Sequence, residues 1–154
     1  MEVLRIISFN VNGLLTPCSS SKLSKREFIL LIAKKYCANV ILIQETHTTI
    51  QDSNVIKQLF SLKWNFFHAP GKSDSCGVIT LISKEINSSL IKYCNKGRLL
   101  HVQVEINYKK YNIVNIYAPS SSNIDKISWL QSINWKDFKK DTIIGGDWNI
   151  PISS

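Results

Sequence analysis

The sequence predicts an α/β sandwich built from mixed β-sheets. Strand-like and helix-like stretches alternate along the chain, and no apolar run approaches the roughly 18 residues that a membrane span requires. The 154 residues, 44% of them hydrophobic, suffice for one domain with a buried core and exclude general disorder. A net charge of +8, from 19 Lys and Arg against 11 Asp and Glu, favours a polyanionic partner.

The first part of the chain has the pattern of a strand, a helix and a second strand. Residues 3–9 form a short apolar run that ends at a polar turn. Ser24 and Glu27 have the spacing of a capping box, and the residues after them predict a helix with one buried face: Phe28, Leu31, Ile32, Ala33 and Tyr36. The run 40–43 is apolar throughout, as in a strand buried on both faces. This order implies a parallel strand pair with a crossover helix.

The rest of the chain is predicted to be mostly strand. A helix over residues 52–61 would face inward with Val55, Ile56, Leu59 and Phe60, and a short helix over 124–131 precedes a last strand at 142–144. Further strands are expected at 63–68, 77–83, 89–93, 99–106 and 111–117. The alternation in 99–106 is typical of a half-buried antiparallel strand, and the break after it predicts a hairpin.

Polar residues follow three of these strands at the point where each strand ends. Asn10 and Asn12 follow the first, Glu45 follows the second, and Asp147 with Asn149 follows the last. Functional groups in α/β sheets gather at the carboxyl ends of strands, so these side chains converge if the strands are neighbours. Two carboxylates and several amide oxygens suit Mg²⁺ or Mn²⁺. Each segment taken alone also fits ordinary turn chemistry.

Four segments, taken in order, resemble successive motifs of the endonuclease/exonuclease/phosphatase superfamily: Ile7–Leu14, Ile43–His47, Asn115–Pro119 and Gly145–Pro151. Gly77-Val78 and Gly97-Arg98 also fall where the superfamily has a Gly-Val strand start and a Gly-Arg turn. The residues Gln-Glu-Thr-His and Asn-Ile-Tyr-Ala-Pro are most similar to the apurinic/apyrimidinic-type endonuclease domains of non-LTR retrotransposons. Each motif alone is weak evidence for the superfamily. Together, in the right order and across nearly the whole chain, they are strong evidence.

The resemblance implies a four-layer α/β sandwich, with two β-sheets face to face and helices outside. It implies metal-dependent hydrolysis of phosphodiester bonds in DNA, with Mg²⁺ or Mn²⁺ held by Glu45, Asn10 and Asp147. The sequence has no signal-peptide pattern and no membrane span, so we expect an intracellular protein without membrane association. The resemblance further implies a nuclear protein fused to a reverse transcriptase in the full-length product.

The resemblance also assigns catalytic roles. Tyr117 resembles the tyrosine that contacts the scissile phosphate, and Asp147 resembles the carboxylate that orients or deprotonates the attacking water. Asn149 resembles a phosphate-contacting residue, and Asn10 and Glu45 complete the catalytic set. Three further residues are expected to bind substrate: Asn12, His47 and Arg98.

The superfamily carries a later Ser-Asp-His-like motif, whereas no histidine follows Asp147 in this sequence. Residues 1–154 are therefore expected to be the N-terminal two-thirds of an endonuclease domain, as a fragment, a decayed retroelement copy or a truncated gene product. We expect His68 and His101 to be structural. Three functions stay open: a Mg²⁺-dependent DNA endonuclease impaired by this loss, a catalytically dead remnant with weak nucleic-acid or metal binding, and a phosphatase or phospholipase. The Gln-Glu-Thr-His motif and the basic charge disfavour the third.

Overall fold

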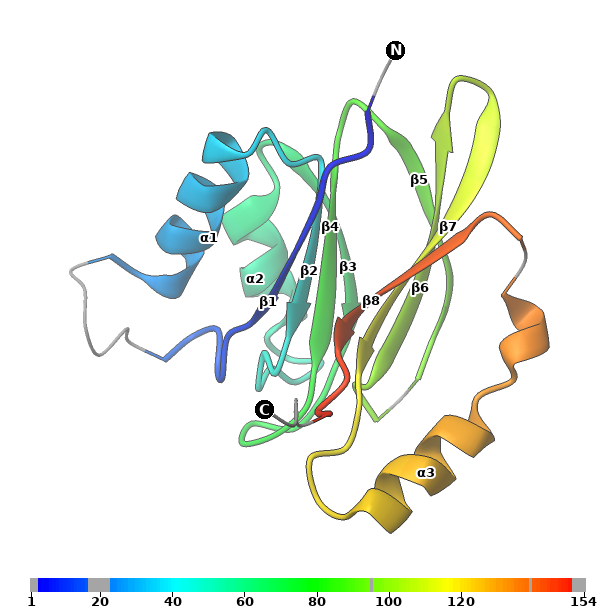
Figure 1. Ribbon diagram of the computed structural model, residues 1–154. Coiled ribbons are helices and arrows are strands. Elements are labelled where there is room, and N and C mark those ends of the chain that lie inside the picture. The colour runs from blue at the N-terminus through cyan, green and yellow to red at the C-terminus, as the bar shows by residue number, and fades with distance from the viewer. Residues whose placement is uncertain (1–2, 17–22, 95, 139, 151–154) are drawn as a thin grey trace.

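A computed structural model describes residues 3–16, 23–94, 96–138 and 140–150. The strands of the described residues form two four-stranded β-sheets (Figure 1). Sheet A has the strand order β1 (Ile6–Asn10), β2 (Val40–Gln44), β4 (Val78–Ser83), β3 (Trp64–Ala69). Sheet B has the order β5 (Asn87–Tyr93), β6 (Leu99–Ile106), β7 (Lys109–Tyr117), β8 (Thr142–Asp147). The helices are α1 (Lys25–Lys35), α2 (Ser53–Phe60), α3 (Asn123–Ser132) and the 3₁₀ helix η1 (Trp135–Asp137).

Both sheets are mixed, and each contains one parallel pair. Strands β1 and β2 are parallel and joined through α1, which confirms the predicted crossover. In sheet B, β7 and β8 are parallel, whereas β5, β6 and β7 pair antiparallel. The predicted hairpin between β6 and β7 is also confirmed. Its two central residues, Asn107 and Tyr108, have φ of 51° and 61°, the left-handed backbone that a two-residue turn requires.

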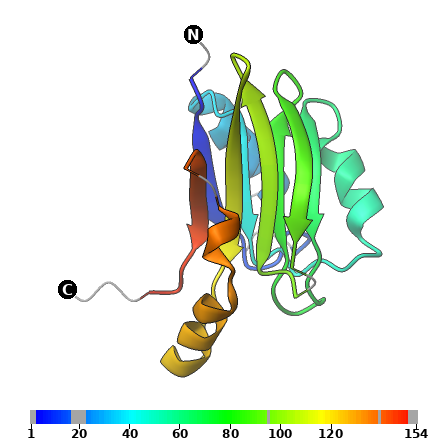
Figure 2. The ribbon, with the colours of Figure 1, turned by 90° about the vertical axis from the view of Figure 1, so that its right-hand side faces the viewer.

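The sheets pack face to face, and helices lie on both outer sides. Helices α1 and α2 cover sheet A, whereas α3 and η1 lie on the side of sheet B (Figures 1 and 2). The predicted α/β sandwich with four layers is therefore confirmed. None of the helices among the described residues is long and apolar enough to cross a bilayer.

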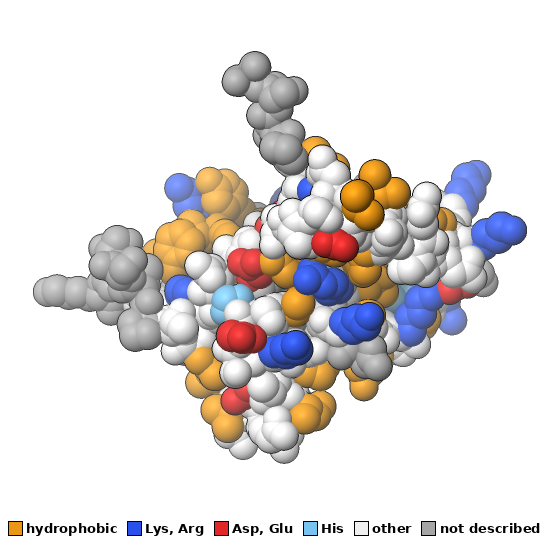
Figure 3. Space-filling view, turned by 90° about the horizontal axis from the view of Figure 1, so that it is seen from below, with side chains coloured by type: hydrophobic (Ala, Val, Ile, Leu, Met, Phe, Trp, Pro, Cys, Tyr) orange, Lys and Arg blue, Asp and Glu red, His pale blue; other side chains and the backbone are white. Residues whose placement is uncertain are grey.

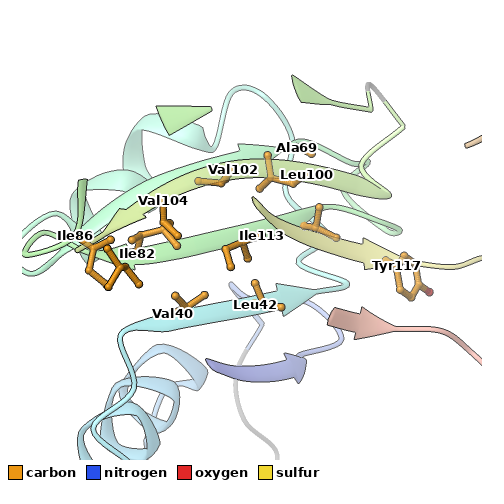
Figure 4. Close-up of a cluster of buried hydrophobic side chains, with 12 residues drawn as sticks. Val40, Leu42, Ala69, Ile82, Ile86, Leu100, Val102, Val104, Ile113 and Tyr117 are labelled. Atoms are coloured by element: carbon orange, nitrogen blue, oxygen red, sulfur yellow. The ribbon is translucent and has the colours of Figure 1, made fainter. Parts of the chain in front are cut away.

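The core between the sheets explains why β2 is apolar along its whole length. Successive strand residues point to opposite faces, so Val40 and Leu42 pack toward sheet B (Figure 4) while Ile41 and Ile43 pack toward the helices. All four side chains are buried. The predicted strand with two buried faces is confirmed.

Helix α1 begins as predicted but presents a different face to the core. Ser24 accepts a hydrogen bond from the Glu27 amide, and Glu27 accepts one from the Ser24 amide, which completes the capping box. The predicted inward face was wrong for Phe28, Leu31 and Tyr36, which are 46%, 55% and 57% exposed. Ala33 is buried as predicted, together with Ile29, which was not predicted. The Arg26 side chain donates to Leu59 O of α2, which fixes the rotation of α1. Val55 of α2, also expected inward, is 58% exposed.

Two histidines are structural, as predicted. The ring of His68 contacts the hydroxyls of Thr48 and Ser53, at 3.0 and 2.7 Å. His101 lies on the face of β6 that the alternation assigned to solvent, but Phe138 covers it edge-on, and its Nε2 lies 2.9 Å from Asn112 Oδ1. The expected exposure of that face at His101 was therefore wrong. Pro151, the last residue of the segment Gly145–Pro151, lies outside the described residues.

Candidate active site

The predicted site residues lie where four strands end. Asn10 and Tyr117 are the last residues of β1 and β7, Asp147 is the last of β8, and Glu45 follows β2 directly. Since β1 runs parallel to β2 and β7 runs parallel to β8, each pair of strands ends at one edge of its sheet. Figure 3 views this end of the molecule and shows acidic side chains with basic side chains close by.

Asn10 and Asp147 meet across the two sheets. The Asn10 side-chain amide donates a 2.7 Å hydrogen bond to Asp147 Oδ2, and the Asn149 backbone amide donates a 2.9 Å bond to Oδ1. Both carboxylate oxygens of Asp147 therefore accept hydrogen bonds from neutral N–H donors, which fix the orientation of the carboxylate. Asn10 Oδ1 in turn accepts from the Asn12 amide at 3.1 Å, so Asn12 enters this cluster through its backbone.

Glu45 and Tyr117 form the second contact across the sheets, in which the Tyr117 hydroxyl donates to Glu45 Oε1. Strand alternation alone would point Glu45 toward the helices, because Gln44 before it faces sheet B. Glu45 has φ of 52°, and this left-handed backbone turns its side chain toward Tyr117. Burial, followed by the hydrogen bond from the hydroxyl to Glu45, raises the pKa of Tyr117 to about 12, so the hydroxyl keeps its proton at neutral pH.

The predicted substrate-binding residues surround these contacts. The Arg98 guanidinium lies 5.0 Å from the centroid of the Tyr117 ring and donates to Tyr117 O at 3.2 Å. His47 is half-buried and follows Glu45 by two residues, also with a left-handed backbone. Asn149 donates through its side-chain amide to Ala118 O at 2.7 Å, and its own carbonyl accepts from Lys126 of α3.

Two glycines allow β8 to approach its neighbours closely. A Cβ on Gly145 would lie 2.7 Å from Leu42 Cδ1 of the opposite sheet. A Cβ on Gly146 would lie 2.0 Å from the Ile116 carbonyl oxygen, and Gly146 has φ of 138°, which other residues rarely adopt. The place of Asp147 therefore depends most on Gly146, where a Cβ would clash with backbone, and less on Gly145, where it would meet the end of a side chain.

A family model described as the Endonuclease/Exonuclease/phosphatase family matches residues 7–154. The chain belongs to this family. Over 161 aligned positions it is also 28% identical to the Transposon TX1 uncharacterized 149 kDa protein of Xenopus laevis, covering 98% of this chain and 11% of that protein. The predicted family is thus confirmed, and a transposon protein is among its relatives.

Solved structures show the same fold at low identity. D. rerio TDP2 complexed with a single-strand DNA product matches with a TM-score of 0.67 and 22% identity, over 97% of this chain and 62% of that chain. The endonuclease domain of TRAS1, a telomere-specific non-LTR retrotransposon, matches with a TM-score of 0.66 and 16% identity, over 96% and 61%. The chain therefore spans about three-fifths of the length of these family structures.

Three polar residues that lie next to the candidate active site were not predicted from the sequence as site residues. Gln44 and Asn115 are buried between the sheets and hydrogen-bond to each other at 2.8 Å. A polar residue within an apolar strand, such as Asn115 between Val114 and Ile116, is the signal that indicates such a partner. Lys25 places its ammonium group 2.7–2.8 Å from the carbonyl oxygens of residues 11, 12 and 13, which holds the loop after β1. No local sequence pattern around Lys25 indicates this contact.

The donor atoms of the site fit a hard divalent cation. Glu45 and Asp147 supply carboxylate oxygens and Asn10 supplies an amide oxygen, the ligand types of Mg²⁺ and Mn²⁺. Among the described residues, no cluster of three or more His, Cys, Asp or Glu side chains is placed to hold a metal ion, and the candidate site has only two such side chains, Glu45 and Asp147. Glu45 engages Tyr117 through Oε1, and its Oε2 has no hydrogen-bond partner among the described residues.

A cavity of about 620 Å³ lies at the other end of sheet A, between the C-terminal ends of α1 and α2. Its lining includes an apolar floor with Phe60 and Trp64 and a basic rim with Arg26, Lys34 and Lys63. Arg26 already donates to a carbonyl of α2, and helix C-termini favour cations. The helix ends therefore account for these charges, and the cavity is separate from the candidate active site.

Proposed function

We propose that this chain carries the site of a divalent-metal-dependent DNA endonuclease that hydrolyses phosphodiester bonds. One observation carries the proposal: two hydrogen bonds across the sheets, Asn10 to Asp147 and Tyr117 to Glu45, gather four functional side chains from four strands. A structural role does not require two carboxylates at an exposed sheet edge, because neither carboxylate neutralises a cation there among the described residues. Catalysis of phosphodiester hydrolysis does require such groups.

In this proposal Glu45 is the principal metal ligand, with Asn10 and Asp147 beside it. When bound, Mg²⁺ or Mn²⁺ supplies a Lewis acid that stabilises negative charge on the phosphate oxygens. The Asn10 side-chain amide holds Asp147 in place by a hydrogen bond. Because this amide is neutral, it adds no positive charge that would repel the cation.

The other side chains of the site are assigned the activation of water and the binding of the phosphate. Asp147, held between two N–H donors, would orient a water molecule for attack on phosphorus and accept its proton as the new P–O bond forms. The P–O bond to the leaving oxygen would break in the same displacement, and the leaving oxygen would take up a proton from solvent. When DNA binds, the Tyr117 hydroxyl would turn from Glu45 to donate to a phosphate oxygen, and the second N–H of the Asn149 side-chain amide would donate to another while the first stays on Ala118 O. Hydrogen-bond donors placed in advance at developing negative charge lower the barrier most.

DNA is the proposed substrate because the charge of the chain and its relatives point the same way. The net charge of +8 favours a polyanion, and Arg98 places a guanidinium beside Tyr117. One solved structure of the same fold is complexed with a single-strand DNA product, and another is a retrotransposon endonuclease domain. We assign Asn12, His47 and Arg98 to DNA binding. A retrotransposon-type function also implies that the full-length product contains a reverse transcriptase and that it acts in the nucleus.

A plasmid-nicking assay tests the proposal. Supercoiled plasmid is incubated with the unmodified chain and Mg²⁺, with EDTA in a parallel reaction, and with the Glu45→Ala variant. We expect nicking that EDTA and Glu45→Ala both abolish, whereas Glu85→Ala, an exposed carboxylate at the far end of sheet A, leaves it unchanged. Mn²⁺ binding without any Glu45-dependent nicking would contradict the proposal and indicate a binding-only remnant.

A further inference from the structure

A buried polar network crosses the otherwise apolar space between the sheets. Gln44 of β2 donates to Asn115 Oδ1 of β7 at 2.8 Å, and the Asn115 amide donates to Ile79 O of β4 at 2.9 Å and to Ile43 O of β2 at 3.3 Å. Gln44 and Asn115 are 1% and 0% exposed. One side chain of sheet B is therefore bonded to two strands of sheet A.

The network lies next to the candidate active site along the chain. Gln44 directly precedes Glu45, and Asn115 is two residues before Tyr117, on the same face of β7. Ser8 Oγ accepts from Gln44 at 3.0 Å and lies two residues before Asn10 on β1. Each member of the network thus adjoins a side chain of the site.

Hydrogen bonds fix relative position in a way that the surrounding core does not. The neighbouring core residues Leu42 and Ile113 are apolar, and apolar contacts are non-directional. A shift of one sheet against the other would leave the amides of Gln44 and Asn115 buried without partners, which is costly. The network therefore specifies one alignment of the two sheets.

We infer that Gln44 and Asn115 are positioning residues, which set the placement of Glu45 relative to Tyr117 across the sheets. This inference rests on the proposed endonuclease function. Neither residue reaches the site surface, since both are fully buried, so their effect on the reaction is exerted through Glu45 and Tyr117. A displacement of about 1 Å at such groups costs about 10²-fold in rate.

The test compares two asparagines of β7 that are both buried and both hydrogen-bonded. Asn115→Leu removes the bonds to sheet A, whereas the control Asn112→Leu removes a bond to His101 within sheet B. We expect Asn115→Leu to lower kcat for plasmid nicking by about 10–100-fold with KM nearly unchanged. Asn112→Leu should lower Tm by a comparable amount and keep kcat. Equal loss of kcat in both variants, or unchanged kcat in Asn115→Leu, would overturn the inference.

Gln44→Met is the second variant, in case Asn115→Leu does not fold. It keeps the Asn115 bonds to Ile79 and Ile43, so we expect a smaller fall in kcat in the same direction. A third measurement is independent of activity: nuclear Overhauser effects between the Tyr117 ring and the Glu45 side chain. They should be present in the unmodified chain and in Asn112→Leu, and weakened in Asn115→Leu and Gln44→Met. Unchanged effects in both would refute the positioning role, whereas failure of the unmodified chain to nick DNA refutes only the proposed function.

Discussion

The side-chain amide of Asn10 donates to the carboxylate of Asp147, which lies 137 residues further along the chain and in the other sheet. Asn10 ends the first strand of sheet A and Asp147 ends the last strand of sheet B. The geometry of the site therefore depends on how the two sheets are packed as well as on each local motif.

Asn10→Ala should reduce plasmid nicking by about 10²-fold, because Asp147 loses the donor that orients it. The free energy of unfolding should fall by only about 1 kcal/mol, since the bond lies at the exposed edge of the sheets. Nicking rates and urea denaturation measure the two effects. Asn65→Ala is the matched control, because Asn65 also donates across the sheets, to Ser88, away from the site. A similar loss of nicking in both variants would contradict the assigned role.

Tyr117→Phe should keep the fold and the core packing of the ring but lower the nicking rate by about 10²-fold, since it deletes the hydroxyl donor. Tyr111→Phe, a change of the same chemistry earlier on the same strand, should leave the rate unchanged. Single-turnover nicking at saturating Mg²⁺ is the measurement. Full nicking activity of Tyr117→Phe would contradict the catalytic role assigned to this hydroxyl.

The two glycines of β8 should differ in their tolerance of alanine. At Gly146 a Cβ would lie 2.0 Å from a backbone oxygen, on a backbone with φ of 138°, so Gly146→Ala should destabilise the protein by about 3 kcal/mol. At Gly145 the Cβ would meet only Leu42 Cδ1, the end of a flexible side chain, so Gly145→Ala should cost about 1 kcal/mol. Thermal denaturation ranks the two variants. The reverse order would show that β8 relaxes away from β7.

Stability should fall as the pH is lowered from about 6.5 to about 4 because of His68. Burial lowers the pKa of His68 from its ordinary value of 6.5 to about 4. Between these values the unfolded chain binds a proton at this residue and the folded chain does not, so acidification favours unfolding. We expect a loss of about 1–3 kcal/mol over this interval, measured by urea denaturation at several pH values.

The control for this pH effect is His68→Gln. This variant should be less stable at pH 7, because contacts with Thr48 and Ser53 are altered. Its stability should nevertheless change less between pH 6.5 and pH 4, since the titrating ring is gone. An unchanged slope in the variant would assign the pH dependence to other groups.

Much of the fold followed from local patterns in the sequence. The apolar run at residues 40–43 and the Ser24–Glu27 spacing each determined an element, because strand burial and helix capping depend on nearby residues. The face of α1 was misjudged, since Phe28 and Leu31 are as apolar as Ile29. The bond from Arg26 to α2 and the shape of sheet A, which select between these faces, are tertiary features.

The site residues could be named from the sequence, whereas their contacts could not. The motifs gave Glu45 and Asp147, but the left-handed backbone that turns Glu45 toward Tyr117 has no sequence signal, as the residue is not glycine. Whether Asn10 and Asp147 would meet depended on the packing of two separate sheets. Their contact is a property of tertiary structure, and the structure alone supplies it.

Sheet A is formed entirely by residues up to and including Ser83, and sheet B entirely by residues from Asn87 onward. The two sheets are thus consecutive in the chain and joined by one short turn. A chain divided at this turn would yield two polypeptides, one carrying Asn10 and Glu45 and the other carrying Tyr117 and Asp147. Neither polypeptide would hold a complete site, and mixing them would restore nicking only if they associate. Nicking by the mixture would then measure the association of the two polypeptides and would rise with the concentration of the scarcer one.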